Sequence, residues 1–295
     1  MIQTDMVVEK IKRTSPGVEV ERKIITTSGD VDRKTPLFAL SQKGIFEKEV
    51  DQAVVDGKVD FAVHSMKDVP TVLHAKLAIA CVPERGATAD VLVSKHGEKL
   101  RLLRDGKIVG TSSLLRAAEL RRVRPRLKVE PIRGNVDTRV EKVERGDYDA
   151  TILAEAGLAR LGLMDKVAER LSLDDFPPAP GQGTLAVVAR RSDSKLLEIL
   201  AKIGHEPTQA EARAERELVR VLEGGCKVPL GALASANRET VQLTGSIFSI
   251  DGKQRLVAKT VGPVDEAVKI GKSVGEKLLE KGAKKIEETW RTAYS

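Results

Sequence analysis

Short apolar runs that lead directly into amphipathic helical stretches recur along the middle of this chain. Residues 107–113 are typical of a strand before the helix 114–122, residues 127–135 of a strand and turn before the helix 136–146, and residues 147–163 of a third strand and helix. Within the helical stretches, apolar side chains recur at the spacing of one helix face. Strands that alternate with helices in this way predict an α/β fold with parallel strands.

A similar unit precedes this one. Residues 18–25 alternate apolar and polar side chains, as a half-buried strand does, and a helix that ends at Gly57 leads into the strand 60–65. Residues 184–191 are typical of a buried strand that returns to this first sheet. We therefore predict two similar, periplasmic-binding-protein-like α/β domains. Their ligand is expected in the cleft between them, because such sheets bind ligands outside the carboxyl ends of their strands.

The last third of the chain has a different character. Residues 246–260 predict a hairpin that turns at Asp251 and Gly252, and the helix 266–282 is expected to end the globular part. This pattern predicts a small α+β third domain. The expected boundaries are 1–84 with 184–203 for domain 1, 88–178 for domain 2 and 206–295 for domain 3.

The charge balance limits the class of partner. The net charge is +7 and the pI is about 9.3, which favours anionic ligands. Nucleic acid is not expected, because aromatic residues make up 3% of the chain and the basic residues do not form one tract. No apolar run approaches the roughly 20 residues that cross a bilayer, and the first residues lack the order of a signal peptide, so we expect a cytoplasmic protein without a membrane partner. The two cysteines form no CxxC pair, which gives no support for a metal site.

Asp68 lies in the segment HSMKDVP, directly after the predicted strand 60–65. Pro70 restricts Val69 to extended geometry. An aspartate held there beside Lys67 suits acid–base chemistry or the stabilisation of a cation. A carboxylate that caps a turn next to a solvated lysine is an equally good interpretation.

Serine and arginine residues gather at the predicted strand-to-helix turns of the second unit. A helix N-terminus, expected at Ser113, favours anions, and guanidinium groups hold carboxylates through paired hydrogen bonds. Several arginines aimed into one cleft would bind a polycarboxylate, although any one of them alone is more simply a surface residue. The arginines concerned are Arg116, Arg133, Arg139 and Arg160.

Cys226 follows two glycines and precedes Lys227. Glycine lets another group approach the backbone closely, and the neighbouring lysine favours the thiolate. We therefore interpret Cys226 as a nucleophile or a covalent attachment point. Cys81, inside the apolar run 77–84, is instead expected to be a packed core thiol.

Six segments, in order along nearly the whole chain, resemble those of the hydroxymethylbilane synthase (porphobilinogen deaminase) family. HSMKDVPT and LEGGCKVPLGA in this order are highly specific, whereas PGQG alone is weak. The other four segments are GTSSL, RGNVDTR, LAEAGLARLGL and PAPGQG.

This resemblance implies a three-domain, monomeric transferase of tetrapyrrole (haem) biosynthesis. It would join four porphobilinogen molecules head to tail with release of ammonia, on a dipyrromethane cofactor that a thioether attaches to Cys226. Asp68 would protonate the departing amine and stabilise the resulting cation. The implied cofactor ligands are Cys226, Lys67, Ser113, Arg116, Arg133 and Arg139, and the implied substrate ligands are Ser65, Lys43, Arg160 and Gln182.

The chain departs from the family pattern at two places. Family members usually begin with a strand of the type R-I-G-T-R-x-S-x-L-A, whereas this chain starts within the following helix. Domain 1 is therefore expected to lack an N-terminal strand, with exposed hydrogen-bonding edges beside it. Leu115 stands where the family has an arginine that binds cofactor carboxylates. Two other interpretations stay open, an inactive or truncated family member and a non-enzymatic carboxylate-binding protein.

Overall fold

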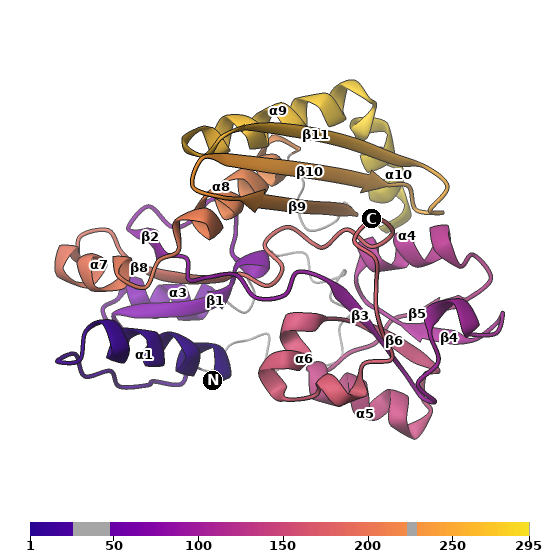
Figure 1. Cartoon of the computed structure of the whole chain (residues 1–295), viewed down its shortest axis with the longest axis horizontal. Coiled ribbons are helices and arrows are strands. Elements are labelled where there is room, and N and C mark those ends of the chain that lie inside the picture. Colours follow the sequence, from indigo (N-terminus) through magenta and orange to yellow (C-terminus); the bar gives the residue numbers. More distant parts are fainter. Residues whose placement is uncertain (26–47, 223–228, 295) are drawn as a thin grey trace.

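Three β-sheets, each covered by its own helices, make up the described part of the chain in the computed structural model (Figure 1). The structure describes residues 1–25, 48–222 and 229–294. The strand orders are β1-β8-β2 in the first sheet, β5-β4-β6-β3-β7 in the second and β11-β10-β9 in the third. The architecture is mixed α/β, as the sequence predicts.

The strand β8 lies at the centre of the first sheet and is buried along nearly its whole length. The predicted return of residues 184–191 to this sheet is confirmed. The parallel pair predicted from residues 18–25 and 60–65 does not form, because residues 18–25 are not a strand. The strand β8, for which no direction was predicted, enters the sheet at the end where β1 leaves it, with Leu185 opposite Ser65, and so runs antiparallel to β1. The elements are β1 (Phe61–Ser65), β2 (Leu77–Cys81) and β8 (Leu185–Arg190), with α1 (Ile2–Thr14), α3 (Lys48–Val55) and α7 (Ser194–Ala201) packed on them.

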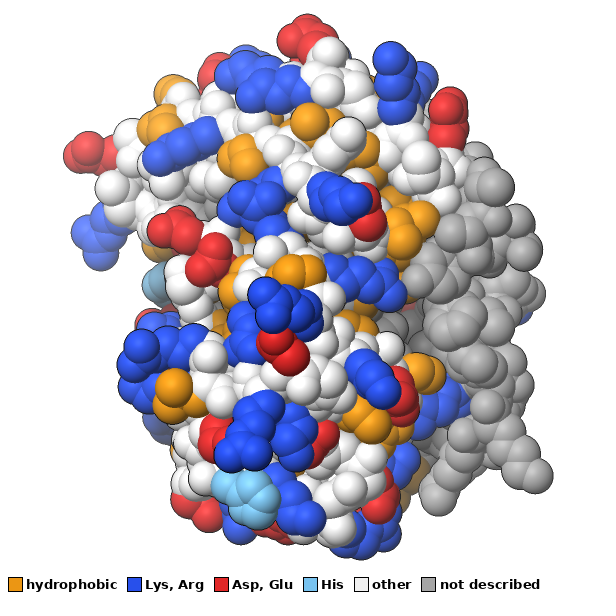
Figure 2. All heavy atoms as spheres, turned by 90° about the vertical axis from the view of Figure 1, so that its right-hand side faces the viewer, with side chains coloured by type: hydrophobic (Ala, Val, Ile, Leu, Met, Phe, Trp, Pro, Cys, Tyr) orange, Lys and Arg blue, Asp and Glu red, His pale blue; other side chains and the backbone are white. Residues whose placement is uncertain are grey.

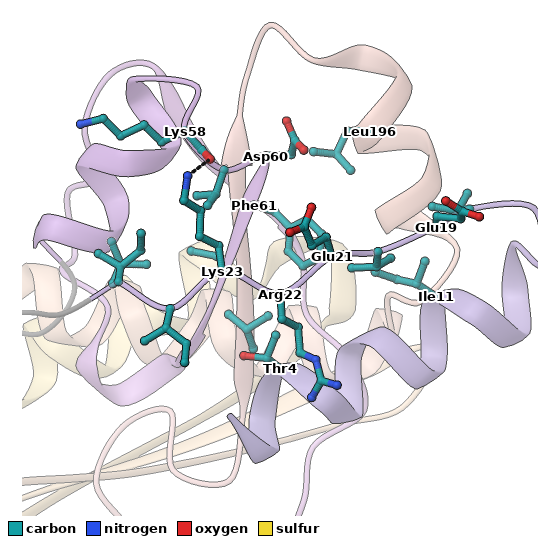
Figure 3. Close-up of a pocket in the computed structure, with 18 of the residues that line it drawn as sticks. Thr4, Ile11, Glu19, Glu21, Arg22, Lys23, Lys58, Asp60, Phe61 and Leu196 are labelled. Carbon is teal, nitrogen blue, oxygen red and sulfur yellow. Dashed lines mark hydrogen bonds between the residues drawn. The ribbon is translucent and has the colours of Figure 1, made fainter.

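Residues 18–25 form no strand, which corrects the prediction for this segment. Their alternation is real, because Val18 and Val20 pack against the core of the first sheet. A cavity of 770 Å³ separates the segment from β1, however, and Lys23 reaches across it from Nζ to the carbonyl oxygen of Lys58 at 3.5 Å (Figure 3). Without a neighbouring backbone in hydrogen-bonding range, alternation alone does not make a strand.

The second sheet confirms the predicted parallel α/β order at its centre. The strand β4 pairs in parallel with β5 and β6, and Val109 lies opposite Val129 and Ala150. Gly146 ends α5 in the left-handed conformation, with φ of 90°. The strand β3 lies antiparallel between β6 and β7. The elements are β3 (Asp90–Ser94), β4 (Ile108–Gly110), β5 (Lys128–Glu130), β6 (Ala150–Ala154), β7 (Glu169–Arg170), α4 (Leu114–Val123), α5 (Val136–Arg145) and α6 (Glu155–Leu161).

The third sheet contains the predicted hairpin, in which β10 and β11 pair from Phe248 and Arg255 around a turn at Gly252. The expectation that the helix 266–282 ends the globular part is wrong. A further helix follows and buries Trp290, whose Nε1 donates to the carbonyl oxygen of Phe248 at 2.9 Å. This helix packs on the domain because burial of so large an apolar side chain is stabilising. The elements are α8 (Glu206–Val221), β9 (Leu230–Ala236), β10 (Thr240–Phe248), β11 (Arg255–Pro263), α9 (Ala267–Glu280) and α10 (Ala283–Tyr294).

The segments that connect the three sheets meet at a buried cluster, named here the junction, of Arg85, Gly181, Gln182, Glu215 and Ala234. Arg85 donates two hydrogen bonds to the Glu215 carboxylate, of 2.8 and 3.2 Å, and a third from Nε to the carbonyl of Gln182 at 2.9 Å. Glu215, on α8, also accepts from the backbone N–H groups of Gly181 at 2.6 Å and Ala234 at 2.8 Å. The Arg85 side chain is 7% exposed and that of Glu215 is 1% exposed. One helix of the third sheet therefore fixes both connections between the first two sheets.

Candidate active site

A cavity of 660 Å³ lies between the carboxyl end of β1 and the helices α5 and α6 of the second sheet. Because its walls come from both sheets and from the connecting segment 181–184, we identify it with the predicted cleft. Many of the predicted site residues line it. They are Ser65, Lys67, Asp68, Arg116, Arg139, Arg160 and Gln182.

The chain turns as soon as β1 ends, through a single 3₁₀ turn over Met66–Asp68 that we name the aspartate turn. The Val69 N–H closes the turn on the carbonyl of Met66 at 3.2 Å. On the opposite strand, the carbonyl of Thr184 accepts a hydrogen bond of 2.9 Å from the Met66 N–H. The first sheet and its connecting segment thus fix the start of the turn, and Asp68 stands at its end in the cleft.

Gly181 packs against the aspartate turn from the junction side. Its φ of 77° favours glycine, and a Cβ atom there would lie 2.9 Å from the backbone nitrogen of Lys67 and 2.9 Å from the side chain of Met66. A larger residue would push the turn out of place. The glycine of the PGQG segment is therefore needed for the close approach that places Asp68.

The cleft shifts the pKa values of Lys67 and Asp68 in opposite directions. Both side chains reach solvent, yet the surrounding cleft walls remove much of their hydration, and this effect is the largest on each of them. It raises the pKa of Asp68, against the charges of Lys67 and His64, and it lowers the pKa of Lys67, against the attraction of Asp68. A carboxyl group with a raised pKa is suited to hold or move a proton near neutral pH.

Two arginines from the second sheet line the same cavity as this carboxyl group. Arg139, on α5, donates from Nε to the carbonyl of Gly134 at 2.8 Å, and Arg160, on α6, donates to the carbonyl of Gly183 at 3.3 Å. Burial, followed by the charges of Arg116 and its neighbours, lowers the pKa of Arg139 to about 10, and burial also lowers the pKa of Arg160. Within the described residues neither arginine forms an ion pair, so both charges are available to an anion.

Arg116 lines the cleft but is already paired. Its guanidinium makes two hydrogen bonds of 2.8 Å to the buried carboxylate of Asp90 and a third of 3.0 Å to the carbonyl of Ile152. Burial lowers the pKa of Arg116, but the attraction of the Asp90 carboxylate outweighs this effect, so the pKa is raised. Gln182 completes the group by donating to Asp90 at 2.7 Å and to the carbonyl of Thr88 at 2.8 Å. These contacts position the cleft wall.

Two of the other predicted site residues, Ser113 and Arg133, do not line the cleft. Ser113 is the N-cap of α4, as predicted, where its hydroxyl accepts from the backbone N–H of Arg116 at 3.4 Å. Arg133 is half-buried, and its positive charge contributes to the lowered pKa of Arg139. Cys226 and Lys43 lie outside the described residues.

Sequence reasoning missed the residues that support the site from behind. Gln3, on α1, donates to the hydroxyl of Ser65 at 2.9 Å and so holds the end of β1. Asp90 stands at the start of a buried strand and carries no local signature of its role. Glu215 lies among many charged residues of α8, where its burial follows from the packing of that helix against the third sheet.

Leu115 packs away from the cleft. It belongs to the apolar cluster of the third sheet, together with Leu218 and Trp290, and is 6% exposed. A leucine at this point of α4 therefore adds apolar contact between the second and third sheets, in place of the arginine that the family pattern has there.

Glu119, one turn further along α4, gives a prediction about stability. It is fully buried, both carboxylate oxygens lack a hydrogen-bond partner in the described part of the chain, and burial raises its pKa well above the usual value. As pH rises, Glu119 therefore loses its proton in the unfolded chain before it does so in the folded protein. Between about pH 4.5 and the pKa of Glu119 in the folded protein, the free energy of unfolding of wild type is expected to fall relative to that of Glu119→Gln. The expected fall is about 1.4 kcal/mol for each pH unit.

Urea unfolding of wild type and Glu119→Gln between pH 4.5 and 8 measures this difference. Glu141→Gln, at an exposed position of α5, is the control and is expected to show no such slope. A difference between wild type and Glu119→Gln that stays constant with pH contradicts the expectation.

One face of the molecule carries charges of both signs. On the face shown in Figure 2, lysine and arginine side chains are dispersed and acidic side chains lie among them. Ion pairs such as Arg126 with Asp105 at 2.8 Å and Arg145 with Asp147 at 2.8 Å neutralise part of the positive charge. Across the described residues, the helices are too short or too polar to span a membrane.

Comparison with known families accounts for most of the chain. The family described as porphobilinogen deaminase, dipyromethane cofactor binding domain, matches residues 1–198, and the porphobilinogen deaminase C-terminal domain matches residues 209–280. Together with the three sheets, these matches confirm the predicted α/β architecture with a small C-terminal domain.

Two sequence relatives bear the name of the same family, and one solved structure is a more distant match. A probable porphobilinogen deaminase of Nitrosopumilus maritimus (strain SCM1) is 47% identical over 289 residues, which are 98% of this chain and 92% of the relative. The porphobilinogen deaminase of Desulforudis audaxviator (strain MP104C) is 43% identical over 286 residues, with coverages of 97% and 93%. A substrate binding domain of a putative amino acid ABC transporter from Streptococcus pneumoniae covers 74% of this chain and 86% of its own, with 16% identity and a TM-score of 0.42.

Proposed function

The chain belongs to the porphobilinogen deaminase family, whose members are transferases with a dipyrromethane cofactor, and from that premise we propose that it acts as a hydroxymethylbilane synthase. In this reaction four porphobilinogen molecules are joined head to tail, and each addition releases one ammonia. The observation that carries the proposal is the placement of Asp68 in a cleft with Lys67, Arg139 and Arg160.

The residues of the cleft fit the cofactor. Dipyrromethane carries acetate and propionate groups, and Lys67 and Arg139 offer it cations that form no ion pair within the described residues. We propose Cys226, which follows α8 in the sequence, as the thioether anchor, with Ser113, Arg116 and Arg133 as further ligands or supports. When bound, the cofactor supplies the pyrrole carbon from which the chain of rings is extended.

Asp68 is the proposed catalytic residue. A carboxyl group beside the aminomethyl nitrogen keeps a proton on that nitrogen while the carbon–nitrogen bond breaks and its electron pair leaves with ammonia. As a carboxylate, the same group then faces the cation left on the methylene carbon. In a crowded cleft this attraction is stronger than in water. A new carbon–carbon bond to a pyrrole ring would consume the cation, and the proton that the ring then loses would pass to the Asp68 carboxylate and restore the acid.

Cationic and polar side chains around Asp68 suit the rest of the substrate. Porphobilinogen carries two carboxylates, and Arg160 is proposed to hold them through charge-assisted hydrogen bonds. Ser65 and Gln182, which line the cleft, and Lys43 are proposed as further substrate contacts. The proposal also includes the domain boundaries given above, a monomeric enzyme and a cytoplasmic location.

Ammonia release distinguishes this enzyme from a protein that only captures carboxylates. The full chain, incubated with porphobilinogen, is expected to release one ammonia for each porphobilinogen consumed and to form a linear tetrapyrrole. Reversible binding of porphobilinogen without ammonia contradicts the proposed function and favours a binding protein.

A further inference from the structure

We infer that Arg216 is a positioning residue for Asp68, and that it acts through the backbone that follows the aspartate turn. The inference rests on the proposed function, because it concerns the step assigned to Asp68. Arg216 lies on α8, which packs beneath the third sheet and reaches the first sheet from there (Figure 1). It was not singled out by any motif of the sequence.

The guanidinium of Arg216 binds three consecutive carbonyl groups. It donates to Val69 at 3.2 Å, to Pro70 at 2.7 Å and to Thr71 at 3.1 Å. On the other side of the turn, its Nη1 lies 4.0 Å from the sulfur of Met66. Arg216 therefore contacts the chain both immediately before and immediately after the pair Lys67 and Asp68 that enters the cleft.

An arginine side chain can bind these three carbonyl groups, whereas a neighbouring β-strand cannot pair regularly with this segment. Pro70 has no backbone N–H, so a regular ladder cannot hold this segment, whereas a planar guanidinium offers five donors in a fixed arrangement. Within the described residues Arg216 forms no ion pair with a carboxylate, and burial lowers its pKa. Its bonds to the carbonyls therefore account for its orientation.

Arg216 cannot act on the substrate directly. It lines a separate cavity of 280 Å³ behind the aspartate turn, with Cys81 and Met66, and it is not among the residues that line the 660 Å³ cleft. The charged groups that influence the pKa of Asp68 are Lys67 and His64. Arg216 thus controls where the carboxyl group stands and how far the cleft walls exclude water from it.

The same helix also carries Glu215, the neighbour of Arg216, into the junction, and it ends a few residues before Cys226. One rigid element therefore links the catalytic turn to both connections between the first two sheets. Through Arg216, α8 fixes the position of the acid relative to these connections.

The test compares Arg216→Met and Arg216→Lys with wild type in the full, cofactor-loaded enzyme. Loss of the carbonyl contacts is expected to lower kcat about 10- to 100-fold with KM for porphobilinogen within about twofold, because small displacements of a reacting group have effects of this size. A loosened turn also hydrates Asp68, so the acid limb of the kcat profile is expected to move to lower pH. Arg216→Lys keeps the charge and part of the hydrogen bonding and is expected to fall between wild type and Arg216→Met.

Arg213→Met is the matched control, because Arg213 lies one turn away on α8, borders the same 280 Å³ cavity and forms none of these bonds. The inference is contradicted if Arg216→Lys and folded Arg216→Met behave like the control. In that result both variants keep the wild-type kcat, and the acid limb of their kcat profile does not move. If wild type itself releases no ammonia from porphobilinogen, the proposed function fails, which is a separate result.

Discussion

Replacement of Asp68 by asparagine is expected to lower kcat for porphobilinogen about 1000-fold, with the fold intact. The amide has nearly the same shape, but it can neither return a proton nor carry the negative charge that faces the cation, and groups with these roles contribute factors of this order. Because burial in the cleft already raises the pKa of Asp68, loss of its charge is not expected to destabilise the protein. Ammonia release under saturating porphobilinogen measures the rate.

Asp137→Asn provides the control for this change. Asp137 lines the same cavity, and its carboxylate is bound locally to the N–H of Thr138 at 2.7 Å. This variant is expected to keep its rate within a few-fold of wild type. Full turnover in Asp68→Asn contradicts the role assigned to Asp68 and favours the interpretation of that residue as a turn cap.

The acid limb of the pH profile reports the same group. The carboxylate form of Asp68 faces the cation, so kcat is expected to fall as pH drops through a pKa above the ordinary value of 3.8. This limb should be absent from the residual activity of Asp68→Asn.

Replacement of Glu215 by alanine is expected to lower the free energy of unfolding by about 3–5 kcal/mol. The change removes the nearer of the two carboxylates that pair with the buried guanidinium of Arg85, so that only Glu211, at 3.4 Å, is left. It also removes the acceptor for the N–H groups of Gly181 and Ala234. A buried charge that loses its main partner is costly, because water does not reach the site to replace the lost contacts. Urea unfolding, followed by circular dichroism, measures the loss.

Glu217→Gln is the control on the same helix. Glu217 pairs with the exposed side chain of Arg220, and its replacement by the isosteric glutamine is expected to cost at most about 1 kcal/mol. The double variant Arg85→Met with Glu215→Ala is expected to lose less than the sum of the single losses, since the guanidinium and the carboxylate that pair most closely are then removed together. Equal losses for Glu215→Ala and Glu217→Gln contradict the account of the junction.

Local sequence patterns predicted the second sheet well and the first sheet poorly. The units around β4, β5 and β6 are contiguous in the chain, so strand, turn and helix signals follow one another in order. In the first sheet β8 returns from far along the sequence, and nothing in the run LAVVAR indicates the direction in which it enters. Residues 18–25 show the complementary limit, because their alternation indicates burial of one face but not the presence of a strand beside them.

The candidate site shows the same division. The motif around Asp68 and the arginines at helix starts indicated which side chains meet in the cleft, because the carboxyl ends of strands gather there. The partners behind them were not predictable in this way. Asp90 pairs with Arg116 across the second sheet, and Arg216 reaches the aspartate turn from the third sheet, so both depend on packing between distant segments.

The mass of the intact purified protein tests the central claim most directly. If this chain is a working member of its family, wild type is heavier than its polypeptide by the mass of one dipyrromethane, and Cys226→Ser has the mass of the polypeptide alone. A wild-type protein without added mass, or a Cys226→Ser variant that keeps it, contradicts the account.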